Sequence, residues 1–327
     1  MNNINQTLTN IKVYTIILVV IGHVLAIYTP NSIFPHSGTK LTGMLYNIIY
    51  SFHMPLFISV SGAVYALCRR RGKYSTWNEL LKAKWRRVLL PYFSFGLIIL
   101  FPVLIALDKM EVNFGTFMSI IYGGSEIRHL WYLYVLFEMF IITRIMEKTI
   151  ISNKRLVFFV LLGITILAYN HDITSIFQIN MLLKYYIYFI LGYYVGNETI
   201  KINLSLYQGF ILLVIGLLGN YYMYQLPPIP YSIVNIITSL SLSILAFTIC
   251  QKYNLQQNTK FYEYLRKDGM GIYLFHVVII YILFRYNSFG QLGIYIQAIL
   301  VTLISFFISI IITRLIRSIK LGFLIGE

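Results

Sequence analysis

Apolar runs follow one another along most of the chain and are separated by short polar connections. A run of about 20 apolar residues is long enough to cross a bilayer as an α-helix. Together with turn and charge signals, the pattern predicts ten membrane-spanning helices, at residues 12–28, 43–67, 88–107, 129–146, 156–170, 181–197, 204–224, 231–250, 269–286 and 292–313. We therefore expect an all-α polytopic membrane protein that forms a single integral-membrane domain over residues 1–327.

Basic residues are distributed unevenly between the two sets of alternate connections. Of the 26 Lys and Arg residues, only five fall in or near one set, namely Lys40, Lys109, Arg128, Lys184 and Arg285. The remaining 21 belong to the other set and are densest between the second and third spans. Because Lys and Arg accumulate on the cytoplasmic side, we expect both termini in the cytoplasm of a multi-pass protein of the plasma or inner membrane. The first span lacks a cleavage pattern, so we expect it to be retained.

Composition agrees with a membrane protein and narrows the possible functions. The chain is 58% hydrophobic and 11% charged, against about 25% charged residues in soluble domains. Its net charge of +15 follows from the topology, and we expect no nucleic-acid partner. The predicted outer connections are too short to fold into a domain, which leaves a transporter, channel, intramembrane enzyme or scaffold. Cys68 and Cys250 lie at predicted cytoplasmic helix ends, where thiols stay reduced.

The first span carries two polar residues on one face. His23 follows Lys12 by 11 residues, which in a helix places both side chains on the same face, about 16 Å apart. One interpretation is an anchoring lysine and a histidine bonded to a neighbouring helix. The other is a groove that leads from a phosphate-binding cation to an acid–base group.

A second histidine lies next to a proline-induced defect. Pro55 lacks an amide hydrogen and frees the carbonyl of Ser51 inside the second span. His53 could satisfy this carbonyl, or it could face the same cavity as His23. Both interpretations stay open at this point.

Two further positions are candidates for chemistry within the membrane. Glu138 shares a helix face with Trp131, seven residues earlier, and a carboxylate at that depth needs a partner, for which a histidine is the obvious choice. His276 follows Gly269 and Gly271, two glycines that would allow close helix packing.

Arg128 and His129 lie at the predicted outer interface, where an anchoring role is the default expectation. His36 and His171 fall in outer loops and give no specific signal. Phosphate-loop, metalloprotease, paired-cysteine and nucleophile-elbow motifs are absent from the sequence, and we expect no metal.

Six segments carry a resemblance to a known family: Asn10-Ile11-Lys12 with Ile17 to His23, Ser51 to Gly62, Lys84 to Tyr92, His129 to Leu133, Phe189 to Tyr194, and Gly271 to His276. With these segments in this order, the chain resembles the integral-membrane acyltransferases of acyltransferase family 3. It is most similar to their sugar O-acetyltransferase branch, which includes fucose-4-O-acetylase-like proteins. Two positions depart from the family pattern. Thr9 stands where an acidic residue is common, and Lys12 stands where arginine is frequent, so contacts with coenzyme A could differ.

The resemblance implies acetyl transfer from cytosolic acetyl-CoA to a hydroxyl of a glycan or lipid-linked sugar. It makes His23 the general base or, as an alternative, an acetyl-carrying nucleophile. The other roles that follow are coenzyme A binding by Lys12, Lys84, Arg86 and Arg87, orientation or proton relay by His53, Glu138 and His276, and acceptor binding by Trp131, Arg128, His129 and Tyr273.

Two other functions remain possible from the residues alone. Buried His and Glu side chains could run a proton relay in a transporter or flippase of a glycan precursor. The chain could also be a scaffold subunit of a polysaccharide synthase. The acceptor, its side of access and the oligomeric state, for which a homo-oligomer is possible, do not follow from the sequence; beyond its substrates we expect only membrane lipids as partners.

Overall fold

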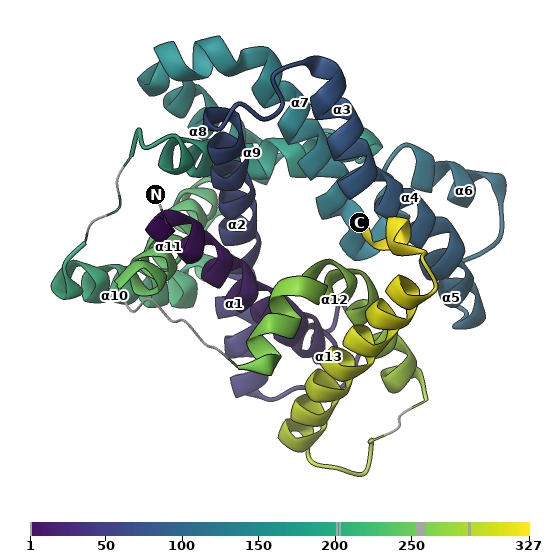
Figure 1. Ribbon diagram of the computed structural model, residues 1–327. Coiled ribbons are helices and arrows are strands. Elements are labelled where there is room, and N and C mark those ends of the chain that lie inside the picture. The colour runs from purple at the N-terminus through teal and green to yellow at the C-terminus, as the bar shows by residue number, and fades with distance from the viewer. Residues whose placement is uncertain (1, 201, 203, 253–258, 287–288) are drawn as a thin grey trace.

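The computed structural model describes residues 2–200, 202, 204–252, 259–286 and 289–327. Within these residues the chain is helical between short connections and contains no β-strand (Figure 1). Its α-helices are α1 (Asn2–Ala26), α2 (Lys40–Arg70), α3 (Trp77–Lys84), α4 (Leu90–Phe95), α5 (Phe101–Ala106), α6 (Phe114–Ile121), α7 (Trp131–Ser152), α8 (Lys154–Asn170), α9 (Ile179–Gly196), α10 (Leu206–Tyr222), α11 (Pro228–Lys252), α12 (Lys260–Arg285) and α13 (Ile294–Ser318).

The all-α polytopic prediction is confirmed, and each of the ten predicted spans overlaps a helix. Seven helical segments in the described residues are long and apolar enough to cross a membrane: Ile4–Ala26, Lys40–Arg70, Trp77–Ala106, Arg128–Ser152, Pro228–Lys252, Lys260–Arg285 and Ile294–Ser318. The other three predicted spans correspond to α8, α9 and α10, of 17, 18 and 17 residues. These helices extend about 26 Å each, and their crossing of the bilayer remains a prediction.

The third span contains two π-helical turns. Trp85–Leu89 separates α3 from α4, and Gly96–Leu100 separates α4 from α5. Each turn is followed by a proline near the start of the next helical segment, Pro91 in α4 and Pro102 in α5. Proline cannot donate a backbone hydrogen bond, and a wider turn before it accommodates the missing bond and the ring.

Helices α2 and α9 pack through glycines that allow their backbones to touch. A Cβ atom on Gly192 would overlap the carbonyl oxygen of Ser59, and one on Gly196 would overlap that of Ala63. On the opposing helix, a Cβ on Gly62 would overlap the carbonyl oxygen of Phe189. This is the close approach that small residues at a four-residue spacing permit between membrane helices.

Helix α1, which carries Lys12 and His23, lies in the middle of the bundle (Figure 1). It contacts α2, α11, α12 and α13. In the view of Figure 1, α10 and α11 lie on one side of α1, while α12 and α13 lie on the other.

Contacts between helix ends place the predicted cytoplasmic connections together. Arg69 at the end of α2 pairs with Glu147 of α7, and Arg317 at the end of α13 pairs with Asp268 of α12. Gln6 of α1 approaches Tyr262 of α12 at the same end. We call this the basic end of the bundle. At the opposite end, Arg285 pairs with Asp108.

Candidate active site

Three histidines that are far apart in the sequence meet inside the bundle. His23 comes from α1, His129 from the turn before α7, and His276 from α12. The ring centroids are 5.1 Å apart for His23 and His276, 5.6 Å for His129 and His276, and 6.4 Å for His23 and His129. We call these residues the histidine cluster. They are not arranged to hold a metal ion, and neither is any other group of three His, Cys, Asp or Glu side chains in the described chain.

Backbone hydrogen bonds determine which ring nitrogens carry hydrogen. Nδ1 of His276 lies 2.9 Å from the carbonyl oxygen of Ile272, and Nε2 of His129 lies 3.1 Å from that of Leu274. Because a carbonyl can only accept, these nitrogens donate. In the neutral rings, His276 Nε2 and His129 Nδ1 are then acceptors. Both are buried and find no hydrogen-bond partner within the described residues, so each can accept a hydrogen bond from a hydroxyl group.

Tyr50 connects the cluster to His53. Its hydroxyl lies 3.4 Å from His23 Nδ1, and its ring lies 4.8 Å from the ring of His53. The carbonyl of Ser51, which Pro55 frees, instead accepts a hydrogen bond from Ser239 Oγ at 2.5 Å. His53 donates to the carbonyl of Ile49 at 2.8 Å. His53 thus does not satisfy the proline defect, and it lies on the same side of α2 as the histidine cluster.

A basic cavity lies below the cluster on the side of the basic end. It consists of two adjoining spaces of about 310 Å³ and about 180 Å³, which share five lining residues: Lys12, Phe57, Val64, Cys68 and Gly269. Its walls carry five cations: Lys12, Arg71, Lys84, Arg87 and Arg266. No carboxylate of the described chain lines either space. The cavity therefore favours an anion such as a phosphate group.

The deep end of the cavity reaches the residues that pack against the histidines. Tyr132 and Tyr273 line it there, with their rings 5.6 Å apart. Tyr132 shares a hydrogen bond of 2.8 Å with Ser61. Tyr273 packs 5.6 Å from the ring of His129 and donates to its carbonyl oxygen. One layer of side chains thus separates the cavity from the cluster.

Lys84 is held at the cavity wall by aromatic rings. Its side chain is buried, and its ammonium lies 3.5 Å from the ring centroid of Phe140, 4.7 Å from that of Tyr74 and 5.6 Å from that of Tyr65. Aromatic faces stabilise a cation without neutralising its charge. In the connection outside the membrane-spanning segments, burial raises the pKa of Tyr74, so this ring stays uncharged.

The sequence model of a family described as an acyltransferase domain matches residues 5–317. The chain belongs to the acyltransferase 3 family. It is a membrane acyltransferase, and the match covers nearly the whole chain, as the resemblance predicted. No curated protein and no solved structure matches it.

Among the cations predicted for coenzyme A, the structure of the acyltransferase separates those that line the cavity from one that does not. Lys12, Lys84 and Arg87 line it. Arg86 instead donates to the backbone carbonyl of Glu327 at 3.1 and 3.0 Å. At 100° per residue, Arg86 lies about 200° around the helix from Lys84. The sequence spacing alone could therefore have indicated that Arg86 faces away from Lys84.

Arg71, Arg266 and Cys68 also line the basic cavity, and sequence reasoning did not select them. Arg71 and Arg266 belong to predicted cytoplasmic connections whose basic residues suit an anion as a group, but nothing in the sequence distinguishes these two from their neighbours. Arg266 also pairs with Glu263 at 2.8 Å. Spacing within one segment could not reveal that α2 and α12 bring these residues to the same space.

The anchoring role expected for His129 is wrong, because the side chain is buried against α12 in the cluster. Arg128 adopts a left-handed backbone conformation (φ +50°) that redirects the chain before α7. Arg128 and Trp131 line a separate pocket at the opposite end. Tyr273 touches His129. Of the four residues predicted to bind the acceptor, Arg128 and Trp131 therefore lie in the separate pocket, whereas His129 and Tyr273 lie at the histidine cluster.

Glu138 does not join the histidine cluster. One of its carboxylate oxygens, Oε2, is buried without a hydrogen bond in the described residues. Within the described residues, Glu138 makes no hydrogen bond or ion pair with the histidine that was expected as its partner. Gly271 packs against Thr313 as predicted, whereas a Cβ on Gly269 would meet nothing within 4 Å. Gly269 faces the basic cavity instead of a helix.

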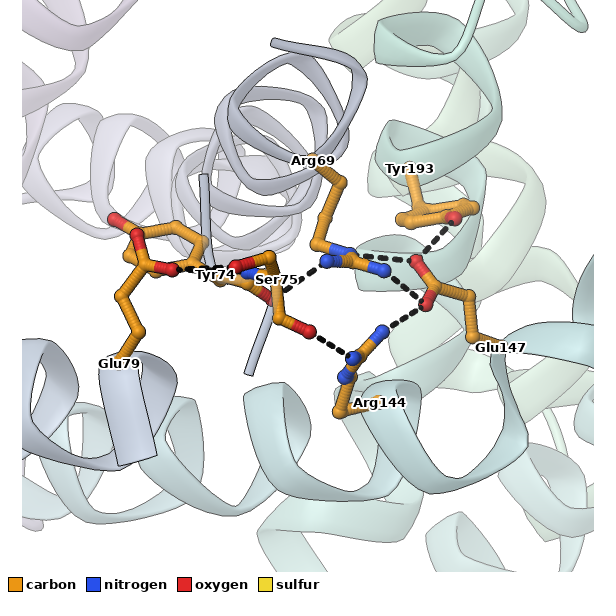
Figure 2. A network of polar contacts seen from close by, with 7 residues as sticks. All are labelled: Arg69, Tyr74, Ser75, Glu79, Arg144, Glu147 and Tyr193. Atoms are coloured by element: carbon orange, nitrogen blue, oxygen red, sulfur yellow. Dashed lines mark hydrogen bonds and ion pairs between the residues drawn. The ribbon is translucent and has the colours of Figure 1, made fainter. Parts of the chain in front are cut away.

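An ion network fixes the connection between α2 and α3 beside the cavity (Figure 2). Glu147 accepts two hydrogen bonds from Arg69, at 3.0 and 2.8 Å, and one from Arg144 at 2.7 Å. The two arginines also donate to the backbone carbonyls of Tyr74 and Ser75, at 2.5 and 2.8 Å. This network ties the connection to α7. The connection leads into α3, which ends at Lys84, and the π-helical turn that carries Arg87.

Replacing Glu147 by glutamine is expected to destabilise the acyltransferase by about 2 kcal/mol, because two largely buried guanidinium groups lose their shared carboxylate. Thermal unfolding in detergent measures the change, and limited proteolysis of residues 71–76 reports loosening of the connection. Glu198→Gln is the control: Glu198 pairs with Arg70 at 2.7 Å but its side chain is 46% exposed, so the loss of stability should be much smaller because solvent screens the pair. Equal losses in both variants would contradict the special role of Glu147.

Proposed function

We propose that this protein is an O-acetyltransferase of the cell membrane that moves an acetyl group from acetyl-CoA to a hydroxyl of a cell-envelope glycan or lipid-linked sugar. The observation that carries the proposal is the basic cavity, in which five cations converge next to a cluster of imidazoles that can accept a proton. Membership of the acyltransferase 3 family supports an enzyme over a transporter or scaffold.

The basic cavity suits the donor because its charge is not neutralised from within. Lys12, Lys84 and Arg87 face a common space lined by no described carboxylate. The phosphates of coenzyme A would bind there. The pantetheine arm would extend toward Tyr132 and Tyr273, since His23 lies about 16 Å from Lys12 along α1.

The two departures from the family pattern have a structural interpretation here. Thr9, in place of the usual acid, lines the cavity and donates to the carbonyl of Asn5 at 2.8 Å. It therefore adds no negative charge beside Lys12. Lys12 would then bind a phosphate as a point charge, without the bidentate fork of an arginine.

In the proposed reaction, His23 removes the proton from the acceptor hydroxyl as the oxygen attacks the thioester carbonyl. The C–S bond breaks, the acetyl group remains on the acceptor oxygen, and coenzyme A leaves as a thiol after taking up a proton. Tyr50 lies against Nδ1 of His23 and would orient the ring. His129 and His276, whose free nitrogens accept hydrogen bonds, would position the hydroxyl or move the proton onward.

The donor site can be blocked through Gly269 without disturbing helix packing. A leucine at this position would extend into the cavity from a Cβ that meets nothing within 4 Å. We expect Gly269→Leu to weaken acetyl-CoA binding at least tenfold and to reduce acetyl transfer correspondingly. The measurement uses radiolabelled acetyl-CoA with purified protein in proteoliposomes and cell-envelope glycan as acceptor.

Gly163→Leu is the matched control. Gly163 is also helical, it is exposed, and a Cβ at this position would likewise meet nothing within 4 Å. It should bind and transfer as the unmodified protein does. Transfer of label to a sugar hydroxyl supports the proposal. If the unmodified protein moves the acceptor across the bilayer without changing its mass, the protein is a transporter and the proposal fails.

A further inference from the structure

A second pocket lies at the opposite end of the bundle from the basic cavity. It has a volume of about 540 Å³, and it is lined by residues from the turn before α7, the start of α7 and the connection between α8 and α9. Its polar and aromatic lining includes Arg128, Trp131, Asp172, Thr174, Gln178 and Asn180. We call it the distal pocket. Its size is in the range of small-molecule sites.

Hydrogen bonds between distant segments build one wall of the distal pocket. Gln178 is buried and donates through Nε2 to the carbonyls of Gly123 and Gly124, at 2.5 and 3.2 Å. The amide of Phe177 donates to the carbonyl of Tyr122 at 2.7 Å. Both Phe177 and Gln178 hold left-handed backbone conformations, with φ of +55° and +52°. Such strain persists only where surrounding contacts impose it, as at binding sites.

Trp131 supplies a flat apolar surface that is supported from behind. Its ring stacks on Tyr185 with centroids 5.2 Å apart and an interplanar angle of 27°. Tyr185 does not line the distal pocket, whereas Trp131 does. A sugar ring presents one face of C–H groups and an edge of hydroxyls. An indole facing amides and a carboxylate matches both parts.

The polar groups of the distal pocket can accept as well as donate. Asp172 Oδ1 accepts a hydrogen bond from Asn180 Nδ2 at 2.7 Å and lies 3.9 Å from Lys184 Nζ. Its side chain is 94% exposed, and a carboxylate has two oxygens, so it keeps capacity for further donors. Oδ1 of Asn180 is buried and has no hydrogen-bond partner in the described chain. The basic cavity, in contrast, is lined by five cations and by no carboxylate of the described chain. A mixture of acceptors and donors favours vicinal hydroxyls over an anion.

We infer that the distal pocket binds a neutral pyranose of the acceptor, with its apolar face on Trp131 and its hydroxyls on Asp172 and Asn180. This inference rests on the proposed function, and it adds the class of acceptor and the end from which the acceptor approaches. His129, two residues before Trp131, belongs to the histidine cluster. We expect a sugar in the distal pocket to approach the cluster from the side opposite the basic cavity.

Trp131 can report on binding directly, without acetyl transfer. The chain has three tryptophans, and Trp77 and Trp85 flank α3 at the basic end. In the full-length variant Trp77→Phe/Trp85→Phe, the fluorescence of Trp131 is expected to change saturably with neutral methyl pyranosides. Asp172→Asn in this background should weaken binding at least fivefold. Asp108→Asn, which changes an exposed carboxylate at the same end, should leave binding unchanged.

The outcomes separate this inference from the proposed function. A saturable response to methyl galacturonate with none to neutral pyranosides would overturn the class of sugar. Absence of any response would overturn the pocket assignment, provided that radiolabelled acetyl-CoA still binds the same variant. If acetyl-CoA binding is absent while pyranosides bind, the proposed donor is wrong and the distal pocket stands.

Discussion

Replacing His23 by alanine is expected to reduce acetyl transfer by about 10²- to 10⁴-fold, the usual contribution of a general base. The ring lies 5.1 Å from that of His276 and shares a contact of 3.4 Å with Tyr50. His23 lies deeper along α1 than Lys12, which lines the basic cavity, and its ring packs against His276 and His129. Removing it would delete the proposed base but none of the cations that line the basic cavity.

Two measurements separate a lost base from a lost fold. Binding of radiolabelled acetyl-CoA to His23→Ala should stay within about twofold of the unmodified protein, since Lys12, Lys84 and Arg87 are untouched. The chromatographic profile in detergent should also be unchanged. His171→Ala, at an exposed loop position, is the matched control and should keep full activity. Full transfer by His23→Ala would show that another group removes the proton.

Most of the fold was predictable because each membrane helix must satisfy its own backbone hydrogen bonds, so the apolar runs mark the helices. The ends of the helices were less predictable. Helix α1 begins at Asn2, ten residues before the predicted start at residue 12, and α12 begins at Lys260 instead of residue 269. Both extensions are polar and lie at the basic end, where hydropathy no longer distinguishes a helix from a loop. Contacts such as Gln6 with Tyr262 stabilise them.

The candidate site was predictable where one helix determines it. Lys12 and His23 share a face of α1 through simple periodicity, and both take part in the site. His129 was not predictable from spacing, because the left-handed residue Arg128 precedes it and turns the ring inward. Arg71 and Glu138 depend on how α2 and α7 pack against other helices. Such contacts over long sequence distances leave no periodic signal in a single segment.

The packing of α2 on α9 yields the largest expected effect on stability. Replacing Gly192 by alanine adds a Cβ that would overlap the backbone carbonyl of Ser59. Backbone cannot move aside as a side chain can, so the two helices must separate. We expect a destabilisation of about 3 kcal/mol, at the upper end for an overpacked interior, with aggregation in detergent and a lower thermal midpoint.

Gly163→Ala provides the opposite expectation at another helical glycine. Its Cβ would meet nothing within 4 Å, and alanine favours a helix over glycine by up to about 1 kcal/mol. Gly163→Ala should therefore be as stable as the unmodified protein or more so. The two variants add the same single methyl group, and only contact between α2 and α9 distinguishes them. If Gly192→Ala unfolds at the same temperature as Gly163→Ala, the close crossing of α2 and α9 does not exist. The positions of Ser61 and Cys68, which α2 brings to the basic cavity, would then have to be reconsidered with it.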